Sequence, residues 1–238
     1  MAVVIFIDSQ ANGAGGGDVI PAAIDFTNVS VTSGSGIEVT NEVTFTGLTS
    51  PINVRAAWTS TSSSPTKAQW VKNGASVQSP GLTYIEATII NNDKLKWQTY
   101  AAYTHPSGNA DSGTTIVTNE TRNATCTMTI ASPAVVSKTG HGYAAGDKIM
   151  FRTTGALPTG VTAGQVYYVI AAGLTADAFE FSATDGGSAI NTSGTQSGTH
   201  TLVSVLDTFT YACQYVRTAG GGSGGGGGGG YSEPPNIN

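Results

Sequence analysis

Two alternating segments that lie far apart in the chain constrain the fold most. Residues 124–130 (ATCTMTI) and 207–216 (DTFTYACQYV) each change between apolar and polar side chains with a period of two, which is typical of half-buried β-strands. We expect the two segments to pair as the last hairpin of an antiparallel β-sandwich. The residues between them are numerous enough to form a small domain of their own, inserted where the hairpin turn would otherwise be.

The composition favours strands over helices. Charged residues make up 11% of the chain, against about 25% in an average soluble protein, and glycine, serine and threonine are abundant. With a net charge of −5 and no basic stripe, we expect no nucleic-acid partner, because such binding relies on neutralising phosphates. Residues 1–7 are apolar, but this run is too short for a signal peptide or a membrane span.

The pattern of turns divides the chain into four parts. Residues 1–22 form an N-terminal arm with a glycine-rich connector. Residues 23–131 and 205–217 carry the short strands of a discontinuous sandwich. They include Asn73-Gly74, which predicts a tight hairpin turn. Residues 132–204 form the inserted small β-barrel. Residues 218–238 are a glycine-rich tail, which is either a flexible tether or a set of packed polyglycine helices.

Several motifs of the sandwich region resemble a known repeat. Residues 42–56 (EVTFTGLTSPINVRA), 69–74 (QWVKNG) and 88–98 (TIINNDKLKWQ) precede the two closing strands in that order. This order is similar to an immunoglobulin-like sandwich repeat found in bacterial surface and phage virion proteins. The resemblance implies an all-β, immunoglobulin-like antiparallel sandwich with the small β-barrel inserted in its last hairpin.

The inserted segment carries a second resemblance. Its motifs include residues 141–143 (HGY), 146–151 (GDKIMF) and 164–170 (GQVYYVI). They resemble a small β-barrel module that is common in phage tail and other virion proteins, and that is similar in shape to the first catalytic-cysteine half-domain of ubiquitin-activating enzymes. Residues 131–204 contain no cysteine, so the resemblance implies a shape and no thioester chemistry.

Few residues are candidates for a site. Cys126 and Cys213 fall on the core-facing side of the two closing strands, where they would form either a disulfide or two buried thiols. Tyr100 and Tyr103 lie close together in sequence and could form an aromatic platform that contacts carbohydrate. The three histidines stand in separate contexts without metal-ligand spacing, and the acidic residues form no pair on one strand face. We therefore expect no catalytic residue, no metal and no cofactor.

Both resemblances imply a non-enzymatic structural protein on the exterior of a tailed-bacteriophage virion, assembled in the host cytoplasm together with other virion proteins. The first interpretation is a tail-associated fibre or adhesin that attaches to a host-surface glycan. One alternative is a capsid decoration or head-fibre protein that binds the major capsid protein, and another is a secreted bacterial surface adhesin. The resemblance to fibre and decoration proteins implies a homo-oligomer, usually a trimer. Closed symmetry is the general rule for homo-oligomers.

Overall fold

The computed structural model describes residues 21, 24–31, 39–60, 68–77, 84–99 and 110–214. All of the regular structure in these ranges is β-strand, so the predicted all-β class is confirmed. The predicted glycine-rich tail lies outside the described residues, and so does the predicted N-terminal arm (residues 1–22) apart from Pro21. In chain order the strands are β1 (Val29–Val31), β2 (Val43–Thr44), β3 (Ile52–Ser60), β4 (Ala68–Lys72), β5 (Ala75–Ser76), β6 (Tyr84–Ile89), β7 (Lys94–Thr99), β8 (Ala110–Met128), β9 (Val136–Ser137), β10 (Lys148–Thr153), β11 (Val166–Val169), β12 (Ala178–Phe179), β13 (Phe181–Ser182) and β14 (His200–Gln214).

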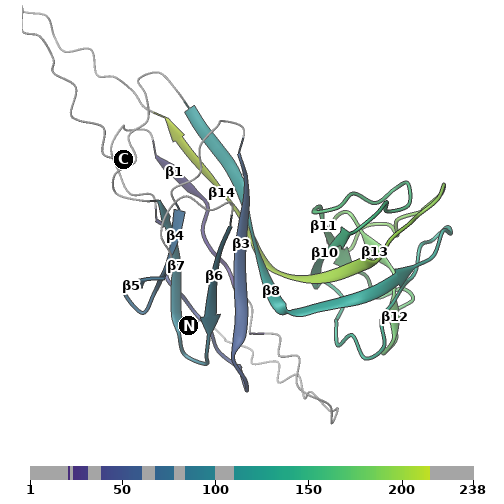
Figure 1. The fold of residues 1–238 in the computed structure, drawn as a ribbon, viewed down its shortest axis with the longest axis horizontal. Helices are drawn as coiled ribbons and strands as arrows, with labels where there is room; N and C mark the ends of the chain where they lie inside the picture. The colour runs from purple at the N-terminus through teal and green to yellow at the C-terminus, as the bar shows by residue number, and fades with distance from the viewer. Residues whose placement is uncertain are drawn as a thin grey trace, which may run out of the picture.

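Two sheets form the first part of the molecule (Figure 1). One contains β6, β3, β8, β14 and β1 as successive neighbours, and the other runs β2-β7-β4-β5. Neighbouring strands are antiparallel throughout, except that β1 is parallel to β14. The predicted turn between β4 and β5 is confirmed, because Asn73 and Gly74 have φ values of 50° and 83°. A tight hairpin turn of this kind requires a positive φ at both central residues.

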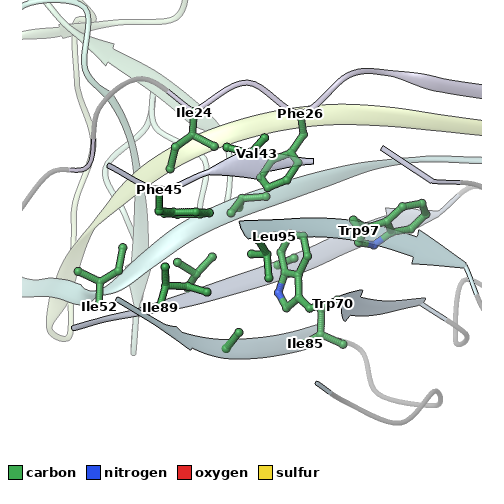
Figure 2. Packing of buried hydrophobic residues seen from close by; sticks show 14 of the residues in the cluster. Ile24, Phe26, Val43, Phe45, Ile52, Trp70, Ile85, Ile89, Leu95 and Trp97 are labelled. Carbon is green, nitrogen blue, oxygen red and sulfur yellow. The ribbon is translucent and has the colours of Figure 1, made fainter. Parts of the chain in front are cut away.

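The first core lies between these two sheets and contains most of the large apolar side chains of residues 24–97 (Figure 2). Every second side chain of a strand points into this core. On β3, for example, Ile52, Val54 and Ala56 all point inward and are buried. Aromatic contacts cross the core: Phe26 lies 5.5 Å from Trp70 between ring centroids, and Trp97 lies 5.6 Å from Phe209. We call this set the first core.

The second core is enclosed by one curled sheet. The order of its strands is β12-β9-β8-β14-β10-β11-β13, and the two edge strands, β12 and β13, are separated in the chain only by Glu180. The sheet therefore curls until its two edges meet. Its interior is lined by apolar and aromatic side chains that include Phe151, Tyr167, Phe179 and Phe181; we call this set the second core.

Two long strands, β8 and β14, run through both parts of the molecule (Figure 1). We expected residues 124–130 to lie opposite residues 207–216, and this register is wrong. Residues 207–214 pair with residues 110–117, while residues 124–126 pair with 200–202. Both strands continue without a break from the first part of the molecule into the second, so no linker separates the two parts along β8 and β14. Cys126 and Met128, which we expected in the sandwich, pack in the second core.

Candidate functional site: the junction between the two cores

The junction is built around an interruption in the β8–β14 pairing. Between the pairs Leu202–Ala124 and Ser204–Asn119, the four residues 120–123 of β8 lie opposite the single residue Val203 of β14. A second irregularity follows, since Leu206 has no partner between the pairs Val205–Thr118 and Asp207–Val117. Such bulges bend and twist a strand pair locally. Here they occur where the ribbon leaves one core and enters the other.

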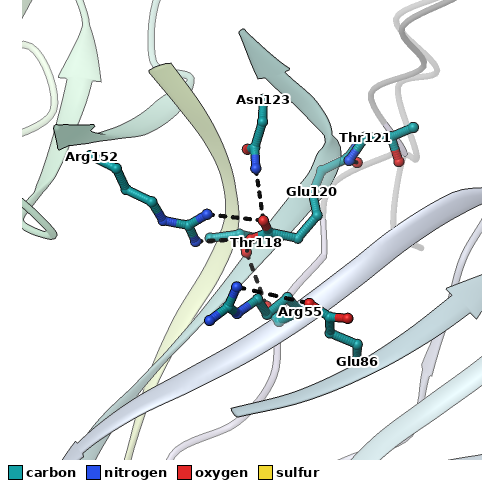
Figure 3. A network of polar contacts seen from close by, with 8 residues as sticks. Arg55, Glu86, Thr118, Glu120, Thr121, Asn123 and Arg152 are labelled. Carbon is teal, nitrogen blue, oxygen red and sulfur yellow. Dashed lines mark hydrogen bonds and ion pairs between the residues drawn. The ribbon is translucent and has the colours of Figure 1, made fainter. Parts of the chain in front are cut away.

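Glu120, in the first of these irregularities, binds a side chain of the second part (Figure 3). Both guanidinium nitrogens of Arg152, on β10, donate to its carboxylate at 2.9 Å, which is the bidentate geometry that makes such pairs strong. Thr118 and Asn123 donate to the same carboxylate. Burial alone would raise the pKa of Glu120, but the hydrogen bonds from Arg152 and Thr118 hold that pKa at about 2. The carboxylate is therefore charged at neutral pH.

The same network continues into the first part of the molecule (Figure 3). The Thr118 hydroxyl also lies 3.1 Å from the carbonyl oxygen of Arg55, on β3. The Arg55 guanidinium lies 3.6 Å from the centroid of the Tyr84 ring and 3.9 Å from a carboxylate oxygen of Glu86, both on β6. Polar contacts thus run from β6 through β3 and β8 to β10.

Asp207 forms a second polar connection, on β14. Its carboxylate accepts the backbone N–H of Phe26 at 2.6 Å and that of Thr208 at 2.7 Å. Lys148 of β10 approaches it to 3.6 Å. Burial raises the pKa of Asp207 above its ordinary value even though these two N–H groups lower it. One side chain therefore connects the segment before β1, the last strand and the second part of the molecule.

A small apolar cluster fills the same junction. Met150, Val203 and Val205 are buried, and Ile116 and Val166 pack against them. Met150 lies between Ile149 and Phe151 of the second core, so it points to the opposite face of β10. The junction is thus closed by apolar packing as well as by two ion pairs, which fixes the orientation of the second part.

Arg122 extends from the irregular segment into the second part. It is buried, donates to the carbonyl oxygen of His141 and lies with its guanidinium 4.3 Å from the centroid of the Tyr143 ring. The Nδ1 atom of His141 accepts the N–H of Tyr143 at 3.0 Å, so the imidazole proton is on Nε2. Burial lowers the pKa of His141. This neutral histidine holds a turn.

The structure does not bring the two predicted cysteines, Cys126 and Cys213, together. Tyr100 and Tyr103 lie outside the described residues. Cys126 lies opposite His200 and Cys213 lies opposite Asp111, near the two ends of the fifteen-residue β14. Because a strand rises by about 3.3 Å per residue, their separation is far above the limit of about 7 Å between Cα atoms. The disulfide alternative is therefore wrong within one chain. Cys126 is a buried thiol, and burial raises its pKa to about 11.

Sequence reasoning missed the junction residues. The chain has only ten lysine and arginine residues, so a glutamate and an arginine inside the threonine- and asparagine-rich segment 118–125 were a usable signal. His200 is buried, and its ring nitrogens lie within hydrogen-bonding distance of Thr153 and Gln196, at 2.9 and 3.0 Å.

The described residues contain no group of three or more histidine, cysteine, aspartate or glutamate side chains that could hold a metal ion. Among the same residues, no helix is long and apolar enough to cross a membrane. Comparison with known proteins found no matching family, no matching curated protein and no matching solved structure.

Proposed function

We propose that the chain is a non-enzymatic structural protein on the exterior of a tailed-bacteriophage virion, where it acts as a homo-oligomeric, tail-associated fibre or adhesin that attaches to the host surface. The observation that carries this proposal is the junction. Two continuous strands, two ion pairs and an apolar cluster hold the second part in one orientation relative to the first. A fixed orientation reduces the entropy that a displayed module loses when it binds.

The order of neighbours supports the immunoglobulin-like assignment of the first part. In that fold, strands B, E and D adjoin in one sheet, and C, F and G adjoin in the other. Here β2, β7 and β4 adjoin in one sheet, and β3, β8 and β14 adjoin in the other, which is the same order when these strands are named B, E, D, C, F and G. Strand β6 is an addition, since it lies beside β3 but follows β4 and β5 in the chain.

The curled sheet supports the barrel assignment of the second part. Closing a sheet leaves no free edge for unwanted pairing. The closure is reinforced by side chains that bind turn backbone, as when Thr192 bridges to the carbonyl of Thr129 and Gln196 donates to the carbonyl of Met128. A compact module attached through two strands is suited to projection from a particle.

The test is immunogold labelling of intact particles with an antibody raised against residues 131–204, with particles from a deletion strain as the control. Gold at the tail or its tip is the expected result. Gold over the head would replace the attachment role with capsid decoration, with the major capsid protein as the partner. Label on the bacterial surface and on no particle would overturn the virion proposal in favour of a secreted adhesin.

A further inference from the structure

Strand β1 is the one strand that runs parallel to its neighbour in the described part of the first sheet. Val29, Ser30 and Val31 pair with Tyr211, Ala212 and Cys213 of β14. In all the other strand pairs the neighbours are antiparallel. The two strands at the beginning and end of the described first part therefore lie side by side and point the same way.

The segment before β1 is attached to β14 by more than this pairing. The N–H of Phe26 donates to Asp207, and Asn28 accepts the N–H of Thr210 at 2.8 Å. Ile24 and Phe26 are buried in the first core, and the Phe26 ring lies 5.7 Å from that of Phe209. Residues 24–31 therefore follow β14 from Asp207 to Cys213 with contacts along the whole length.

Parallel strands respond to tension differently from antiparallel ones. If the chain is pulled at a point before Ile24 and at a point after Gln214, the two handles act at opposite ends of the β1–β14 pair. The strands must then slide past each other, so their hydrogen bonds and flanking contacts are loaded together. If both handles act at the same end of the pair, the contacts are loaded one after another and separate at a lower force.

We infer that the pairing of residues 24–31 with β14 is a mechanical clamp that carries tension along the chain, and that the second part lies outside the path of this tension. The load passes from β1 to Tyr211–Cys213 and leaves after Gln214. The second core, with residues from Cys126 to Leu202, is joined to β14 on the other side of Asp207. The second part would therefore stay folded while the first part is under load. This inference goes beyond the proposed function and does not depend on it.

Single-molecule force spectroscopy on the full chain tests the clamp. One version has handles at the N- and C-termini; the other has handles at the N-terminus and at an unnatural amino acid in place of the exposed Thr195, in the second part. Because three residue pairs yield together in the first geometry, we expect its first rupture force to be higher than that of the second geometry. In that geometry, the extension from the second part should appear as a separate, later event.

A pair of variants makes the test specific. Asn28→Ala removes the acceptor for Thr210, whereas Asn91→Ala removes a comparable acceptor for the N–H of Leu48, away from the clamp. Asn28→Ala should lower the end-to-end rupture force and Asn91→Ala should not. Equal rupture forces in the two geometries, equal losses in the two variants, or opening of the second part before the first would each overturn the inference.

Discussion

The two cores are closed in different ways. The first core lies between two sheets and joins residues from both ends of the described chain, as the contact between Phe26 and Phe209 shows. The second core lies within one curled sheet and takes all its members from residues 126–202. Local contacts form quickly, whereas distant ones wait for loop closure. From this comparison we expect the folding dependence to run one way: the first core needs the second part to fold so that β14 can be positioned, and the second core needs little from the first.

The largest expected effect comes from deleting one aromatic side chain in each core. Phe181→Ala should destabilise the second core by about 3–5 kcal/mol, because it leaves a cavity. It should also lower the stability of the first core, whose last strand would then follow an unfolded insert. Phe45→Ala should destabilise the first core by a similar amount and leave the second core folded. Both side chains are fully buried.

Tryptophan fluorescence separates the two responses. All three tryptophans, Trp58, Trp70 and Trp97, are on strands of the first part, so urea unfolding followed by fluorescence reports the first core. Hydrogen exchange of peptides from residues 143–182 reports the second. If Phe45→Ala removes protection from both cores equally, the one-way dependence is wrong.

A smaller effect is expected at the ion pair between the two parts. Arg152→Lys keeps the charge but loses the bidentate geometry; since the arginine is 35% exposed, we expect a loss of about 0.5–1.5 kcal/mol in unfolding free energy at pH 7. The folded-state pKa of Glu120 is lowered from 4.5 to about 2. Its contribution to stability is therefore complete above pH 4.5 and is lost as the pH falls toward 2.

Urea titrations at several pH values check this. The difference between the wild-type protein and Arg152→Lys should shrink across the range from pH 4.5 to pH 2, as Glu120 becomes protonated. In a Glu120→Gln background, which has no carboxyl group to titrate, the same arginine substitution should show no such narrowing. A difference that stays constant with pH in both backgrounds would contradict the assigned role of Glu120.

The smallest effect concerns Cys126, where we expect no reaction in the folded protein. Burial and a pKa of about 11 keep this thiol protonated and covered at pH 8, so iodoacetamide should label it only when the second core opens. Peptide mapping by mass spectrometry distinguishes it from Cys213. Faster labelling of Cys126 in Phe181→Ala than in Phe45→Ala would show that the second core opens when its own packing is damaged and not when the packing of the first core is damaged. A disulfide-linked peptide containing both cysteines of one chain would contradict the register of β8 and β14.

The positions of the strands were easier to predict from the sequence than the register in which the strands pair. Alternation identified the two closing segments, and Asn73-Gly74 identified a turn, because both signals arise from neighbouring residues. The register of β8 and β14 could not be read in the same way. The extra residues 120–123 and Leu206 shift the pairing, and a bulge has no periodicity of its own. Cys126 was assigned to the wrong core for this reason.

The junction was harder to predict than either core. Arg152 and Glu120 are 32 positions apart, and Lys148 and Asp207 are more distant still, so no local motif joins them. Their pairing follows from β10 lying beside β14, which depends on the closure of the second sheet. The absence of a cysteine in residues 131–204, in contrast, was readable directly from the sequence.

The bulge at Leu206 limits how this protein can change during evolution. Successive side chains of a strand point to opposite faces, and Leu202 and Phe209 are separated by an odd number of positions, yet both point into a core. The unpaired residue Leu206 shifts the alternation of β14 by one position, so that both side chains can face inward. A recombination event that brought in a different module would have to preserve this parity on β14 and the matching irregularity on β8. Exchange breakpoints that keep both cores intact should therefore lie beyond these irregularities, inside the module, and not at the boundary where the two parts meet.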